Sequence, residues 1–85
     1  MGLVNQLALP EALNEEAWAW AEKLASGPTR AFGRAKRLMQ QGLRSDLTAQ
    51  IELEVTAQLE MGKTADHREG LAAFLERRKP AFAGR

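Results

Sequence analysis

A chain of 85 residues forms one small domain at most, and such a domain buries only about 60–65% of the surface of its unfolded chain. Twelve Lys and Arg against eleven Asp and Glu leave a formal charge of +1, which excludes a global attraction to nucleic acid or anionic lipid. No Cys is present, which excludes disulfides and thiolate metal sites, and no apolar run approaches the roughly 18 residues of a membrane span. We expect an ordered cytoplasmic domain that binds neither nucleic acid nor membrane.

The first predicted elements are a short extended segment and a helix. Residues 2–9 are partly β-branched and apolar, but a strand this short needs a partner from outside. Pro10 suits the first turn of a helix, where its missing N–H is not needed, and the Ser-Gly-Pro turn at residues 26–28 predicts that this helix ends at Ala25. Its apolar stripe consists of Leu13, Ala17, Trp20 and Leu24.

A second amphipathic helix is predicted over residues 29–42, with one apolar side and one basic ridge. The apolar side consists of Ala31, Ala35, Leu38 and Met39, and the ridge of Arg30, Arg34, Arg37 and Arg44. Such a ridge could bind phosphates. No aromatic residue interleaves it, however, and abundant Glu can offset its charge, so a solvated helix face is the favoured interpretation.

Asp46 is a capping signal for a third and longest helix, from Leu47 to about Met61. Two apolar rows make this helix apolar over a wide arc, and we expect contacts on two of its sides; the rows are Leu47, Ile51, Val55 and Leu59, and Leu53, Ala57 and Met61. Glu54 falls inside the arc. A buried carboxylate needs a cationic partner, so we predict an ion pair of Glu54 with Arg34 or Lys36.

The fourth helix is predicted to open with Asp66 and Glu69, which resemble a capping box, and to close before Pro80. One of its sides has small residues and a guanidinium, with Phe74 adjacent; it consists of Asp66, Gly70, Ala73 and Arg77. This side could cradle a phosphate-bearing or adenine-bearing ligand. Close helix packing beside an exposed arginine is the alternative. Residues 81–85 form a tail with one aromatic anchor.

Catalytic and metal sites find little support in the residues. His67 is the only histidine, and neither Ser26 nor Ser45 has a histidine nearby in sequence to activate it, so we assign both hydroxyls to capping of backbone groups. We predict no catalytic residue and no metal ligand in this chain. Trp18 and Trp20 lie about 200° apart on the helical wheel, so we expect Trp20 in the core and Trp18 outside it.

The residues also carry a family resemblance. Residues 66–80, followed by Phe82-Ala83-Gly84-Arg85, resemble the closing signature of enoyl-CoA hydratase and isomerase proteins, the crotonase family. The segments at residues 2–5, 24–28 and 35–38 resemble that family in the same order and at similar spacing. The resemblance therefore spans essentially all 85 residues.

The predicted elements make an all-α fold of about four helices in a small bundle with a short extended N-terminal segment. The resemblance implies that they form a single C-terminal helical domain over residues 1–85. The catalytic carboxylates and the oxyanion hole of the family belong to an upstream β/α spiral core, so we expect this chain not to be an enzyme by itself. In the family, the C-terminal helices make subunit contacts and help to close the acyl-CoA site. We therefore expect a helical oligomerisation and site-capping module.

By the same resemblance, Phe74 and Arg77 match tail positions that in some relatives approach the nucleotide end of CoA. No cofactor is required, but CoA or acyl-CoA could bind there. Gln58 departs from the family, because some relatives place an aromatic residue near the ligand at this position. The alternative function is that the chain retains CoA binding, or completes an acyl-CoA hydratase or isomerase with a separate core chain.

The expected partners follow from the apolar faces. Helices that normally cover a core would expose apolar patches when alone, and self-association into a dimer or trimer would cover them. Residues 3–7 could pair with their copy across a two-fold axis. A separate crotonase core chain is the other expected partner.

Overall fold

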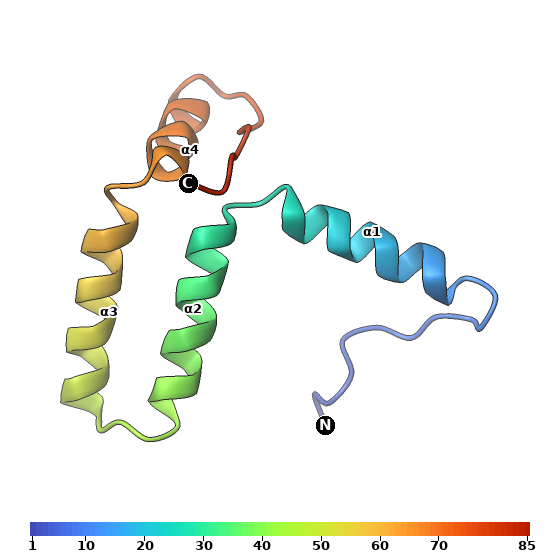
Figure 1. Ribbon diagram of the computed structural model, residues 1–85, viewed down its shortest axis with the longest axis horizontal. Coiled ribbons are helices and arrows are strands. Elements are labelled where there is room, and N and C mark those ends of the chain that lie inside the picture. Colours follow the sequence, from blue (N-terminus) through green and yellow to red (C-terminus); the bar gives the residue numbers. More distant parts are fainter.

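The computed structural model describes residues 1–85 and contains four α-helices and no β-strand (Figure 1). The helices are α1 (Leu13–Ala25), α2 (Thr29–Gly42), α3 (Leu47–Met61) and α4 (Ala65–Leu75). The predicted all-α class and the number of helices are confirmed. No helix combines the length and the apolar character that crossing a membrane would require.

Helix α1 begins three residues later than the sequence predicts. Residues 10–12 form a turn in which the N–H of Ala12 donates to the carbonyl of Leu9 at 2.9 Å, and no side chain caps the start of the helix. Its end at Ala25 is as predicted. The Ser26 hydroxyl donates to the carbonyl of Lys23 at 3.0 Å, which confirms its assignment to capping.

Helices α2 and α3 are antiparallel and lie side by side (Figure 1). At the turn between them, the Asp46 carboxylate accepts the N–H of Ala49 at 2.8 Å, which confirms the predicted N-cap. The Ser45 hydroxyl also caps, by donating to the Gln41 carbonyl at 3.0 Å. These local bonds reverse the chain within four residues and set the two helices against each other.

Helix α4 lies at the end of this hairpin where α3 finishes and α2 starts (Figure 1). Thr64 caps it: its hydroxyl oxygen accepts the N–H of His67 at 3.1 Å and donates to the carbonyl of Met61 at 2.6 Å. The predicted opening at Asp66 and Glu69 is wrong. Both carboxylates bind the C-terminal tail instead, because the preceding threonine already satisfies the first turn.

Very little of the chain is fully buried. Only Ala57, Ala73, Thr64 and Asp66 are buried. Leu38, Leu53 and Met61 are half-buried, and most other large apolar side chains of the helices are exposed. The radius of gyration is 16.2 Å, against about 12 Å for a compact domain of this size. The apolar faces predicted from the sequence are therefore present, but they are covered only in part, where α2 meets α3.

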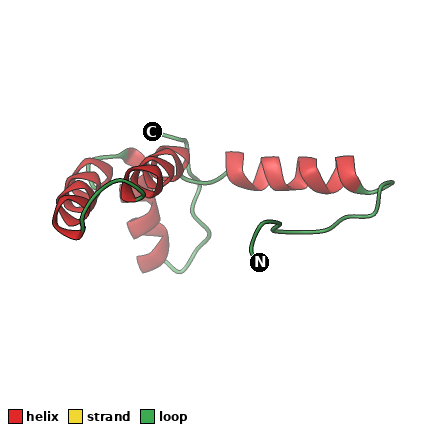
Figure 2. Ribbon diagram, turned by 90° about the horizontal axis from the view of Figure 1, so that it is seen from below, coloured by secondary structure: helices red, strands yellow, loops and turns green.

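Helix α1 projects to one side of the other three helices, and the N-terminal segment runs back beneath it (Figure 2). Gln6 ties this segment to α1, because its amide donates to Glu16 at 2.6 Å and its carbonyl oxygen accepts from the Trp20 ring nitrogen. Trp18 and Trp20 are 69% and 44% exposed, so the expectation that Trp20 lies in the core is wrong for this chain. No other part of the chain covers the apolar stripe of α1 enough to bury it.

Candidate functional site

A groove of about 630 Å³ opens between α2, α3 and α4. Apolar side chains of α2 and α3 form its floor, and residues of α4 and the tail form its far wall. These residues are Ala31, Ala35, Leu38, Ala57 and Met61 on the floor and Gly70, Leu71, Phe74 and Phe82 on the wall. Its size and apolar lining are those of a ligand or side-chain binding site.

Phe74, one of the two predicted CoA-binding residues, lines this groove and is 78% exposed. An aromatic ring so exposed at the rim of an apolar groove gains little from the fold itself. It is available to a ligand or to another surface. Gln58 also lines the groove, so the position at which the chain departs from the family faces the same space.

Arg77, the second predicted residue, does not line the groove. It follows the C-cap of α4 in the left-handed conformation, with φ 54°, where glycine is usual. Its N–H donates to the carbonyl of Phe74 at 3.2 Å, and the N–H of Arg78 donates to Ala73 at 3.0 Å. These two bonds form a Schellman motif. The backbones of Phe74 and Arg77 are therefore joined, but only the phenylalanine side chain faces the groove.

The row of small residues on α4 packs against the chain's own tail. The buried Asp66 accepts the N–H groups of Ala83 and Gly84 at 2.7 and 2.9 Å, and Gly70 lies beside the ring of Phe82. This side of the helix was predicted either to cradle a ligand or to pack closely. In the structure it packs closely, and the packing element is the tail rather than another helix.

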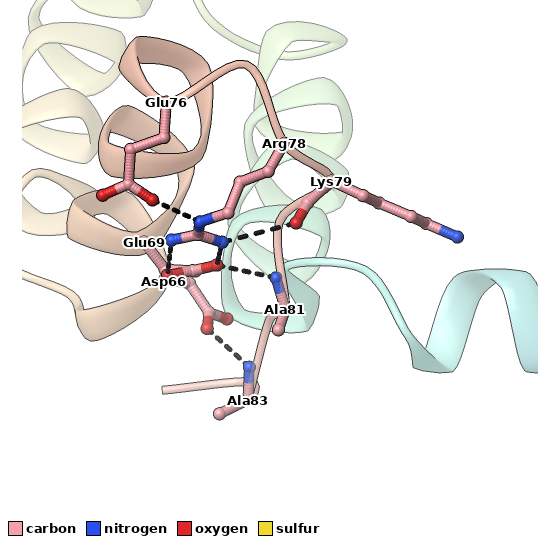
Figure 3. A network of polar contacts seen from close by, with 7 residues as sticks. All are labelled: Asp66, Glu69, Glu76, Arg78, Lys79, Ala81 and Ala83. Atoms are coloured by element: carbon pink, nitrogen blue, oxygen red, sulfur yellow. Dashed lines mark hydrogen bonds and ion pairs between the residues drawn. The ribbon is translucent and has the colours of Figure 1, made fainter.

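We name the attachment of the tail to α4 the tail clasp: Asp66, Glu69 and Arg78 with the tail residues 81–85. Figure 3 shows its contacts at Ala81 and Ala83. The Arg78 guanidinium donates to both oxygens of Glu69, at 2.6 and 3.0 Å, and also to Glu76 at 2.6 Å. The N–H of Ala81 donates to the same Glu69 carboxylate at 2.8 Å. The bonds from Arg78 and then from Ala81 lower the pKa of Glu69 to about 2, and its carboxylate raises the pKa of Arg78 in turn.

The predicted ion pair of Glu54 is wrong. Glu54 is exposed and accepts a hydrogen bond from Gln50 at 3.3 Å, while Arg34 lies 3.1 Å from the carboxylate of Glu60. Because α2 and α3 are antiparallel, Arg34 in the first half of α2 lies level with the last turn of α3, where Glu60 stands. Lys36 takes part in no ion pair.

The roles of Thr64, Asp66, Glu69 and Arg78 were missed from the sequence. The signal available was two acidic residues one turn apart, Asp66 and Glu69, followed by Arg78 just beyond the helix.

No cluster of three His, Asp or Glu side chains is arranged to hold a metal ion. His67 lines the groove and is exposed, with its backbone N–H held by Thr64.

Comparison with known proteins agrees with this architecture. The model of the enoyl-CoA hydratase/isomerase family matches residues 1–85. A Rhodobacter capsulatus protein named as a probable enoyl-CoA hydratase is 46% identical, over 100% of this chain and 33% of its own length. The 1,2-epoxyphenylacetyl-CoA isomerase of Escherichia coli is 36% identical, over 99% of this chain and 32% of its own.

A solved Mycobacterium abscessus structure, assigned to the enoyl-CoA hydratases and isomerases, superposes with a TM-score of 0.95 at 36% identity. The match covers 99% of this chain and 32% of that one, so the chain spans about a third of the length of the relatives that it matches. This chain belongs to the enoyl-CoA hydratase/isomerase family.

Proposed function

We propose that this chain is a helical oligomerisation and acyl-CoA-site-capping module of an enoyl-CoA hydratase or isomerase, working in the cytoplasm. The observation that carries the proposal is the open groove of about 630 Å³, whose apolar walls from α2, α3 and α4 have nothing packed into them. A stable domain rarely leaves an apolar groove of this size and the apolar stripes of its helices uncovered. A module that covers another protein surface requires this arrangement.

The exposed row on α3 is the second support. Leu47, Ile51, Val55 and Leu59 are spaced four apart and are between 51% and 76% exposed. Side chains at this spacing form one continuous stripe along a helix, which fits the apolar face of another helix. Since α2 already packs on another side of α3, this stripe is free to contact a second copy or a core chain.

Catalysis is not expected from the chain by itself. The resemblance places the oxyanion hole and the catalytic carboxylates of the family upstream of the residues matched here, and preorganised donors of that kind are usually the largest catalytic contribution. The test is to incubate the purified 85-residue chain with a crotonyl thioester and follow hydration. We expect no turnover above the buffer rate, and measurable turnover would refute the proposal.

Oligomerisation is tested by sedimentation equilibrium at tens of micromolar. We expect a dimer or trimer for the wild-type chain and a monomer for the double variant Ile51→Gln, Leu59→Gln, with helicity by circular dichroism unchanged in both. Leu43→Gln is the control, because Leu43 is also an exposed apolar residue but lies in the turn after α2, away from the stripe. A wild-type chain that stays a compact monomer would count against self-association.

The alternative, that the chain retains CoA binding or completes an acyl-CoA site with a separate core chain, is supported by Phe74 at the rim of the groove. Isothermal titration with CoA tests its binding form, with Phe74→Ala and Arg77→Ala as variants. Arg77→Gly is the sharper variant, because glycine suits the left-handed position and removes the guanidinium without straining the backbone. No heat at millimolar CoA would exclude binding by this chain, while heat that is lost in these variants would support it.

A further inference from the structure

The basic ridge of α2 lines a second pocket, of about 460 Å³, between the first half of α2 and the end of α3. It shares Arg30, Arg34, Met61 and Thr64 with the groove but includes neither Phe74 nor Arg77, and the tail clasp does not use it. Four cationic side chains line it and a single carboxylate opposes them, so three positive charges are uncompensated; the cations are Arg30, Arg34, Arg37 and Lys63, and the carboxylate is Glu60. The whole chain carries only +1, so this positive charge is concentrated.

The fold creates this concentration from two elements. Arg30, Arg34 and Arg37 follow one side of α2, whereas Lys63 comes from the turn after α3 and closes the pocket from the other side. A ridge on a single helix would be a convex, solvated surface. A second element carrying the same charge makes it a concave site, in which several donors can reach one anion.

The start of α2 adds donors to the same pocket. Thr29, its first residue, lines the pocket, and the preceding Pro28 supplies no side-chain cap. The first hydrogen bond of the helix is from the N–H of Phe32 to the carbonyl of Pro28, so the N–H groups of residues 29–31 have no partner within the chain. There is also no acidic residue in this first turn to offset the helix dipole.

Arg34 has one acceptor beside it, the carboxylate of Glu60. Its Nε atom is fully shielded from solvent yet makes no hydrogen bond, although the Glu60 carboxylate lies 3.1 Å away, because the geometry to that oxygen is unfavourable. The other two guanidinium nitrogens of Arg34 are not shielded and make no hydrogen bond within the chain, so they can donate to an oxyanion in the pocket.

From these observations we infer that this pocket is a binding site for a small phosphorylated molecule, held by Arg30, Arg34, Arg37 and Lys63. Guanidinium groups bind phosphate through paired N–H donors, and Lys63 adds a point charge. The pocket volume lies in the range of sites for small ligands. A nucleic-acid strand is the less suitable ligand, since no aromatic residue lines the pocket to stack a base.

The experiment is a titration of the 85-residue chain with pyrophosphate at low ionic strength and pH 7, followed by amide NMR shifts and by calorimetry. We expect saturable shifts at the amides of residues 29–31 and of Lys63. Arg30→Gln, Arg37→Gln and Lys63→Gln should each weaken binding about fivefold, and Glu60→Gln should tighten it by up to about fivefold. The two directions together keep the inference testable even if one variant unfolds.

Lys36→Gln is the matched control, because it removes the same charge from the same helix at a residue that does not line the pocket. It should leave the affinity within a factor of two, as about half a kcal/mol or less is expected for a distant surface charge. An equal loss in Lys36→Gln, or equal shifts with chloride at the same ionic strength, would overturn the inference in favour of diffuse attraction. Tighter binding of a single-stranded oligonucleotide that depends equally on Lys36 would overturn it in favour of a nucleic-acid surface.

Discussion

Glu69 and Arg78 are joined by two parallel hydrogen bonds, at 2.6 and 3.0 Å, across the turn that ends α4. A bidentate pair of this kind fixes both side chains, and the fixed carboxylate then accepts the N–H of Ala81 at 2.8 Å. The pair therefore determines the path by which the tail returns to α4. Phe82 reaches the wall of the groove only because the chain turns back at this point.

Lowering the pH should detach the tail at Ala81 from Glu69 of α4. The pKa of Glu69 is lowered from 4.5 to about 2 in the folded chain, so its bonds stabilise the folded tail fully above pH 4.5, and this contribution is lost as the pH falls towards about 2. We expect protection of the Ala81 amide against hydrogen exchange to fall over that interval. A ¹³C titration of the Glu69 carboxyl measures the pKa directly, and a midpoint near 4.5 would contradict the clasp.

The Glu69→Gln variant is the control for this titration. Its neutral amide cannot hold Arg78 by charge and offers one acceptor oxygen where the carboxylate offers two. Protection of Ala81 should already be low at pH 6 and should show no further step between pH 4.5 and 2 of the kind assigned to Glu69. A step that persists in the variant would belong to another group.

Replacing Asp66 by Asn should destabilise the attachment of the tail end. Asp66 is buried and each of its two oxygens accepts one backbone N–H, from Ala83 and from Gly84. Asparagine turns one acceptor into an NH₂ donor facing another donor, and leaving one buried N–H unpaired costs about 1–3 kcal/mol. Thermal unfolding and the exchange rates of these two amides measure the effect, with the exposed Glu52→Gln as control.

Replacing Arg77 by Gly should stabilise the chain. Arg77 occupies the left-handed position of the Schellman motif at φ 54°, which costs a side-chain-bearing residue about 1 kcal/mol and costs glycine little. We expect the midpoint of urea unfolding to rise in Arg77→Gly and to stay nearly unchanged in Arg77→Ala, which keeps the Cβ atom. If the two variants behave alike, the left-handed conformation does not hold in solution.

The boundaries of the helices could be read from the sequence wherever a local signal ends a helix. The turn at residues 26–28 and the Asp46 cap are such signals, and the ends of α1, α2 and α3 match them. The start of α1 was predicted too early because of Pro10, which is also a local signal. Proline fits a turn as well as the first turn of a helix, and here residues 10–12 form the turn.

The role of Asp66 could not be read from the sequence, since a carboxylate near a helix start can accept N–H groups of its own helix or of any segment that passes. Only the path of the tail decides between them. The exposure of Trp20 was missed for a related reason. The periodicity of α1 predicts which of its side chains form an apolar face. It contains no information on whether the surface that buries this face belongs to the same 85 residues.

Gly70 tests how closely the tail packs on α4. A Cβ atom at this position would lie 3.5 Å from the Phe82 ring, an ordinary contact distance, so Gly70→Ala should be tolerated and should gain about 0.5–1 kcal/mol because alanine favours the helix. Gly70→Leu extends further along the same direction and must displace Phe82, which should speed exchange of the Ala83 and Gly84 amides. Since leucine is also a good helix former, helicity should persist, and any loss would be confined to the tail. If Gly70→Leu leaves those exchange rates unchanged, Phe82 does not pack on α4 in solution, and the far wall of the groove would have to be formed by α4 alone.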